Sequence, residues 1–244
     1  MQIKIHRGVD QIGGCITEIK TRKTKILIDV GSELPNTESK VKANVSKISK
    51  HCDAVFITHY HMDHVGEYMK VKKKIPIYIG EQAKDIFMIY QNRMKEPKIS
   101  QVTQKHIDRL KIFKTFEPNE TITIGDITIT PIRVDHSAYD SYMFLIEAES
   151  KRILHTGDFR THGPIGKDLP KLLKGIGKVD VLICEHTTLS RTDETFMTEE
   201  MLQEEAVNLI KDNKYVFVMC ASTNIDRIAS FYHANKKAGN KIFI

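Results

Sequence analysis

Four side chains that bind metals in other proteins lie within six residues of the sequence. Segment 58–66 has the pattern His-x-His-x-Asp-His and contains His59, His61, Asp63 and His64. Neutral imidazole and carboxylate are the ligands that Zn²⁺ prefers where thiolates are absent. A loop from a strand to a helix can turn the first two histidines toward one ion and the last two residues toward a second. The spacing therefore predicts a dinuclear site, because a single structural histidine would need none of the other three ligands.

Two ions need further ligands, and two later strand ends provide them. Segment 134–137 (Val-Asp-His-Ser) contains His136, and segment 156–160 (Thr-Gly-Asp-Phe-Arg) contains Asp158. A carboxylate in a Gly-Asp turn can bridge two cations through its two oxygens. Each signal is modest alone, since Gly-Asp turns are common. With the upstream motif present, we expect both residues to be metal ligands.

The elements that must position these ligands follow an α/β pattern. We expect strands at 2–6, 15–20, 25–30, 53–57, 76–79, 111–116, 121–124, 127–134, 141–147, 151–155 and 179–184, with a hairpin turn at 124–127. We expect helices at 41–50, 63–74 and 80–93. Apart from Asp53 and Asp180, the runs at 53–57 and 179–184 are continuously apolar, which indicates buried strands. This mixture of strands and helices predicts an αββα sandwich in which the ligand segments follow strand ends.

The last part of the chain has a different pattern. Helices expected at 198–212 and 224–238 alternate with strands expected at 215–220 and 241–244. Such a βαβ unit is typical of a parallel sheet. Natural chain ends usually lie at the surface beyond the last packed element. The apolar segment 241–244 therefore predicts that the chain is a piece of a longer protein.

Composition sets broad limits on function. The chain has 244 residues, enough to bury a large core, and a net charge of +6. That charge favours a polyanionic partner such as RNA, although a well-solvated lysine-rich surface, including the cluster at 70–74, accounts for it equally. No apolar run approaches the roughly 20 residues that span a bilayer. We expect a cytoplasmic protein without a membrane partner, and four separated cysteines without disulfides.

The motifs resemble the metallo-β-lactamase superfamily. His-x-His-x-Asp-His, the later histidine and Thr-Gly-Asp follow its pattern, and the segments VDHS, TGDFR and ICEHTTLSR resemble its β-CASP branch, which includes RNase J-type and cleavage-factor nucleases. The likeness runs over nearly the whole chain. It implies a metallo-β-lactamase αββα sandwich at 1–197 that lacks its C-terminal return. It also implies the beginning of a parallel α/β domain, the β-CASP domain, at 198–244.

The resemblance also implies roles for particular residues. The first ion would be held by His59, His61 and His136. The second would be held by Asp63 and His64, with Asp158 bridging. Asp29, in the Asp-Val-Gly segment at 29–31, resembles a residue that supports the metal loops, but a simple turn aspartate is an equally good interpretation.

Glu185 resembles an acidic residue that pairs with a downstream histidine, the proton donor to the leaving group. The alternative interpretation is a carboxylate at a strand end that faces solvent. In the family, that histidine and a last metal ligand lie at positions beyond residue 244. His186 stands where many relatives have a small residue. We expect His155, His162 and His186 to be surface or supporting residues.

The main hypothesis is therefore a ribonuclease that cleaves RNA phosphodiester bonds with a water activated by two Zn²⁺ ions, with Mn²⁺ as an alternative metal. Asp63 would orient or deprotonate that water. This chain would be weakly active or inactive without the downstream proton donor. Segment 221–224 supports RNA binding if its amides bind phosphate, although an ordinary helix N-cap explains it equally.

Two other hypotheses remain open. One keeps the metal site and changes the substrate to a thioester, a lactam or a small phosphate ester, because a fold does not determine function. The other is a non-catalytic scaffold that binds RNA or a protein partner. The sequence is compatible with a homo-oligomer.

Overall fold

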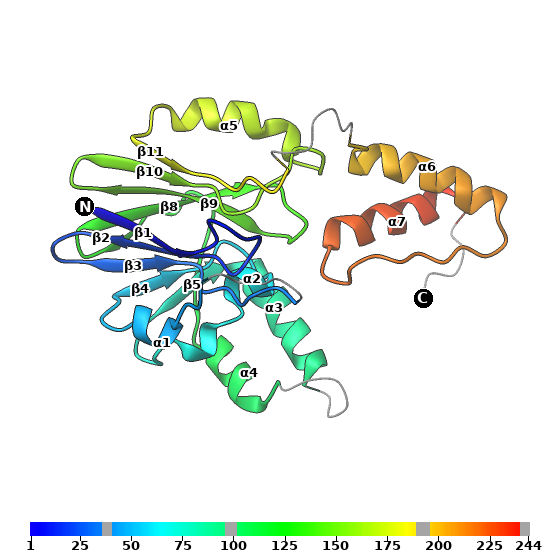
Figure 1. Ribbon diagram of the computed structural model, residues 1–244. Helices are drawn as coiled ribbons and strands as arrows, with labels where there is room; N and C mark the ends of the chain where they lie inside the picture. Colours follow the sequence, from blue (N-terminus) through cyan, green and yellow to red (C-terminus); the bar gives the residue numbers. More distant parts are fainter. Residues whose placement is uncertain (36–40, 96–101, 189–195, 240–244) are drawn as a thin grey trace.

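Two β-sheets pack face to face, and helices cover the outer face of each sheet (Figure 1). The computed structural model describes residues 1–35, 41–95, 102–188 and 196–239. The resulting order of layers is helices, sheet, sheet, helix. The αββα sandwich predicted from the sequence is thereby confirmed.

The first sheet has the strand order β1-β2-β3-β4-β5-β6 and the second β11-β10-β9-β8-β7. The first contains β1 (Gln2–Arg7), β2 (Ile16–Lys20), β3 (Lys25–Ile28), β4 (Ala54–Phe56), β5 (Ile77–Gly80) and β6 (Lys114–Phe116). The second contains β7 (Ile122–Ile124), β8 (Ile127–Val134), β9 (Ser141–Ala148), β10 (Lys151–His155) and β11 (Val181–Ile183). Strands β3 to β6 pair in parallel, so their carboxyl ends meet at one edge. The expected hairpin turn between β7 and β8 is confirmed.

Three apolar layers hold the sandwich together. Between the sheets, Phe56 stacks on Tyr78 and meets the edge of Phe144. Beneath the first sheet, buried side chains such as Tyr68 and Phe87 pack against its strands. Above the second sheet, buried core residues of β8, β9 and β10 contact half-buried leucines of α5. A sandwich of two sheets with helices on both outer faces has three such interfaces between its layers.

The helices of the described residues are short to medium in length. They are α1 (Val45–Ile48), α2 (Met62–Val65), η1 (Tyr68–Lys70), α3 (Glu81–Met94), α4 (Gln104–Lys111), η2 (Gly166–Asp168), α5 (Leu169–Ile176), α6 (Glu199–Asp212) and α7 (Ile225–Lys237). Within the described ranges, no helix has the length and apolar character needed to cross a bilayer. Cys15, Cys52, Cys184 and Cys220 are free in this structure.

Three expected elements are wrong in extent or type. The helix expected at 63–74 ends at Val65, because the Glu67 amide donates to the Val30 carbonyl (2.8 Å) instead of continuing the helix. The helix expected at 41–50 covers only α1, which begins after its N-cap Asn44. The strand expected at 111–116 begins only at Lys114, because Lys111 still belongs to α4, which starts with a capping box of Thr103 and His106.

The strand expected at 215–220 is also wrong. This segment has no regular structure, and its side chains are exposed, with Phe217 at 97% and Met219 at 100%. A strand needs a neighbour for its backbone hydrogen bonds, and among the described residues none pairs with this segment. The strand expected at 241–244 lies outside the described residues. Helices α6 and α7 instead pack on each other through Ala206, Ile210 and Ala234, to one side of the sandwich (Figure 1).

Candidate metal centre

The predicted ligands follow the carboxyl ends of three strands. His59 and His61 come after β4, and His61 is also the N-cap of α2. His136 follows β8 of the other sheet, and Asp158 follows β10. The centre is therefore built across both sheets.

Short distances show that the imidazoles converge. His61 Nδ1 lies 3.1 Å from His59 Nε2 and 3.3 Å from His136 Nε2. Two nitrogens bound to one tetrahedral Zn²⁺ at about 2.0–2.1 Å would lie about 3.3 Å apart. The two distances from His61 Nδ1 therefore fit ligands of a single ion.

A second group shares one residue with the first. The structure brings together His59, His61 and His136 in one set and His59, His64 and Asp158 in another, with the ligand atoms of each set within 4.8 Å of one another. Asp158 Oδ2 lies 3.3 Å from His64 Nε2, 4.0 Å from His59 Nε2 and 3.8 Å from His136 Nε2. One carboxylate oxygen of the second set thus also lies close to His136 of the first set.

Asp63 and Glu185 lie at the margin of this cluster. Asp63 belongs to neither set, but its Oδ2 lies 3.7 Å from His64 Nε2. Glu185 accepts from the Phe159 amide (3.5 Å) and the Thr187 amide (3.2 Å) and also belongs to neither set. Both residues line a cavity of about 460 Å³ together with His64 and Asp158. This cavity gives a small molecule or a chain end access to the cluster.

Burial and charge suit a cation here. Burial lowers the pKa of His59 well below its ordinary range and that of His136 to about 3, so both rings are neutral ligands at pH 7. Burial opposes ionisation of Asp158, but the hydrogen bond and charge of His64 outweigh it and hold the pKa of Asp158 at about 2. Burial alone would lower the pKa of His64, yet Asp29 and Asp158 raise it well above its ordinary range. The cluster therefore stabilises added positive charge, and these donors fit a divalent metal.

Asp29 orients the imidazole rings of His59 and His64. It is fully buried, and its two oxygens accept from the Thr58 amide and the Thr58 hydroxyl, each at 2.8 Å. Oδ2 also lies 2.8 Å from His64 Nδ1, which donates to it. The hydroxyl of Thr58 lies 3.0 Å from His59 Nδ1. With a metal bound, both rings would present Nε2 lone pairs to it, so these contacts favour the supporting role of Asp29 over that of a simple turn aspartate.

Gly31 allows the ligand loop to approach the first sheet. A Cβ at this position would overlap the carbonyl of Asp63, whose oxygen accepts from the Cys15 amide (2.9 Å). We expect Gly31→Ala to displace the 61–64 backbone, destabilise the protein by about 1–3 kcal/mol and weaken zinc binding. Urea unfolding and zinc titration measure these effects.

Gly175→Ala is the matched control, because a Cβ there meets nothing within 4 Å. Equal behaviour of the two variants would contradict the proposed role of Gly31.

The other predicted histidines lie outside both ligand sets. Buried His155 accepts from the Gly157 amide (3.2 Å), and the His162 ring stacks on Phe196. His186 is exposed and lines the cavity beside Glu185. At the start of α7, the side chain of Asn224 accepts from the Arg227 amide (3.2 Å), so the N-cap interpretation of segment 221–224 is correct.

Sequence reasoning missed Asp135, Tyr60 and the arginine of the TGDFR segment, Arg160. Arg160 pairs with Asp135, and Tyr60 donates to the Thr223 carbonyl (2.8 Å). All three stand next to, or two positions from, predicted ligands. That adjacency is the only sequence signal that could have singled them out.

The chain is similar to a known protein family and to several known proteins. Residues 24–218 match the family model described as the beta-lactamase superfamily domain. The chain is 26% identical to a ribonuclease J of Helicobacter pylori over 97% of its own length and 35% of the relative. It is 30% identical to an RNase J-like protein of Methanocaldococcus jannaschii over 78% of its own length and 44% of the relative. The chain therefore spans less than half of either protein.

A solved structure shares the fold. A protein of unknown function from Enterococcus faecalis V583 matches 95% of this chain and 62% of its own length, with a TM-score of 0.75 and 19% sequence identity. At this identity the likeness concerns the fold alone.

Proposed function

The chain belongs to the beta-lactamase superfamily and is related to ribonuclease J, and from this premise we propose that it forms part of a metal-dependent ribonuclease that cleaves RNA phosphodiester bonds. The observation that supports this proposal best is the convergence of four imidazoles and Asp158 across two sheets. No serine or cysteine nucleophile is needed for such chemistry.

We assign the ligands as follows. One ion would be held by His59, His61 and His136, and the other by Asp63 and His64, with Asp158 between them. When bound, two zinc ions supply an activated water at neutral pH and offset charge on the phosphoryl oxygens. Mn²⁺ would accept the same donors.

Two carboxylates are proposed as catalytic residues. Asp63 lies at the cavity wall with 16% of its side chain exposed, and it would accept the proton of the attacking water. Glu185 is held by two backbone amides at the same wall. It would orient the group that protonates the leaving oxygen. Without that group we expect this chain to hydrolyse RNA weakly.

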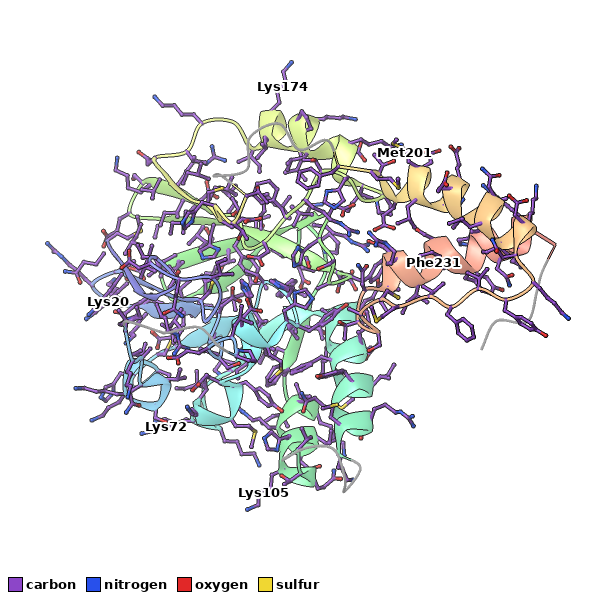
Figure 2. The ribbon with its side chains drawn as sticks, turned by 45° about the vertical axis from the view of Figure 1, so that its right-hand side comes forward. Lys20, Lys72, Lys105, Lys174, Met201 and Phe231 are labelled. Carbon is purple, nitrogen blue, oxygen red and sulfur yellow. The ribbon has the colours of Figure 1, made fainter. Side chains whose placement is uncertain are left out.

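RNA is the proposed partner. The net charge of +6 favours a polyanion, although the labelled lysines Lys20, Lys72, Lys105 and Lys174 project from separate elements and are dispersed around the sandwich (Figure 2). The relatives named ribonuclease J support RNA over a small ester. We further propose a sandwich domain at 1–197, a second domain that begins at 198, and a cytoplasmic location.

Metal content is the first test of this proposal. Protein purified without chelator or affinity-tag metal should contain close to two zinc ions per chain by elemental analysis. One ion would mean that the second ion needs a ligand outside this chain. No bound metal, with no uptake on titration, would instead favour the scaffold hypothesis.

A substrate panel is the second test. The zinc-loaded chain is offered RNA, a thioester, a β-lactam and a small phosphate diester. We expect measurable turnover of RNA only, abolished by chelation and restored by zinc. Turnover of the thioester or lactam in place of RNA would refute the ribonuclease assignment and keep the metal site.

A further inference from the structure

An ionic network with buried Asp135 and Glu199 and partly buried partners joins helices α6 and α7 to the loops of two predicted ligands. It consists of three carboxylates and two guanidinium groups: Asp135, Glu199, Asp226, Arg160 and Arg227. None of these groups is used by the proposed chemistry, so the network needs another explanation.

The inner half of the network ties the two ligand loops to each other. Asp135 precedes His136 directly, and Arg160 follows Asp158 by two positions. The Arg160 amide donates to the Asp135 carbonyl (2.7 Å), and Arg160 Nε donates to Asp135 Oδ1. The other carboxylate oxygen of Asp135 accepts from the Ile165 amide (2.9 Å). The loops of His136 and Asp158 therefore share one buried ion pair.

The outer half of the network connects the guanidinium group of Arg160 to the two helices. Arg160 Nη2 donates to Asp226 on α7 (2.8 Å), and Nη1 lies 3.5 Å from Glu199 on α6. Glu199 is held in turn by Arg227 and by the Ser230 hydroxyl, at 2.9–3.1 Å. Arg160 thus contacts both helices and the loop of one ligand.

Tyr60 makes a second connection between the same parts. It stands between His59 and His61 in the sequence, and its hydroxyl donates to the Thr223 carbonyl just before α7 (2.8 Å). The same oxygen accepts from the Tyr139 amide (2.9 Å) near His136. The start of α7 therefore contacts two of the loops that form the centre directly, and it reaches the His136 loop through Tyr60.

We infer that Arg160 is a positioning residue that couples the placement of α6 and α7 to metal affinity. This inference rests on the proposed metal site. With both helices in place, Asp226 and Glu199 fix the outer face of the guanidinium while Asp135 fixes its inner face. Groups that orient metal ligands change metal affinity about 10–100-fold when they are removed. Because such coupling is reciprocal, metal must also strengthen the contact of the helices with the sandwich.

The first test asks whether the helix contacts strengthen metal binding. It measures the zinc affinity of the 244-residue chain by competition with a chromophoric chelator. Asp226→Asn removes the negative charge that α7 presents to Arg160 and leaves Arg160 paired with Asp135, so the loops remain folded. We expect a loss of affinity of about fivefold, and of about tenfold for Arg160→Lys. Glu205→Gln is the matched control, since Glu205 is an exposed acid on α6, and it should bind zinc like the wild type.

Hydrogen exchange tests the reverse effect, that of bound zinc on the stability of the helices. In the wild type and in Glu205→Gln, zinc should slow exchange of the amides of α7 at least about fivefold. In Asp226→Asn this protection should disappear while the protection of segment 58–64 persists. A purely structural role for Asp226 would lower stability without removing this zinc dependence.

The outcomes separate the two proposals. Wild-type protein that binds no zinc would overturn the proposed function together with this inference. Wild-type protein that binds zinc, with unchanged affinity in Asp226→Asn and Arg160→Lys, would overturn the inference alone. Reduced affinity in both variants, with zinc-dependent protection of α7 only in the wild type and the control, is the expected result.

Discussion

The His59→Ala substitution is expected to remove at least one zinc ion per chain and to reduce RNA hydrolysis by roughly a thousandfold or more. His59 is fully buried and belongs to both ligand sets. Its ring lies 4.0 Å from that of His64 and 4.6 Å from that of His136, centroid to centroid. Without this ring, the first ion would keep two of its three histidine ligands, which weakens zinc binding at that site.

Elemental analysis and zinc titration measure the loss independently of catalysis. His233→Ala is the control, because His233 is exposed on α7 and belongs to neither ligand set. Zinc stoichiometry and affinity equal to wild type in His59→Ala would refute the proposed centre, whatever the activity.

The Asp29→Ala substitution is expected to have the second largest effect. It would leave the buried Thr58 amide and hydroxyl, and the His64 ring, without their acceptor. Loss of a buried charged partner destabilises a protein by about 3–5 kcal/mol, and loss of an orienting carboxylate lowers metal affinity about 10–100-fold. Urea unfolding without metal and chelator competition with zinc measure the two effects separately.

Backbone strain could obscure this result, so a second variant is needed. Asp29 has φ +61°, a conformation that Asn adopts readily and Ala does not. Asp29→Asn keeps the backbone and one acceptor oxygen but removes the charge. We expect it to recover most of the stability and little of the zinc affinity. Full recovery of zinc affinity would show that the carboxylate charge does not act on His64.

Sequence patterns were informative where short-range spacing determines structure. The spacing of His59, His61 and His64 after an apolar run was enough to predict that the three rings lie together, because a strand end and one helical turn fix their directions. The apolar runs likewise predicted strands β4 and β11, although β11 is only partly buried, with Leu182 58% exposed.

Other features depend on contacts between distant segments. The role of Asp29 depends on Thr58 and His64, about 30 residues away, so a local pattern left two interpretations open. Arg160 was visible in a quoted motif, but its partners Glu199 and Asp226 lie on helices whose position the sequence does not specify. Segment 215–220 has strand composition, and composition does not supply the neighbouring strand that pairing requires.

The division of the ligands between two sheets has a consequence for folding kinetics. His59 and His61 leave the first sheet, whereas His136 and Asp158 leave the second. A partly folded state with only one sheet formed would lack at least one ligand of each set. Zinc would therefore bind the native state and not such an intermediate. Added zinc should slow unfolding in proportion to its occupancy and leave the refolding rate unchanged.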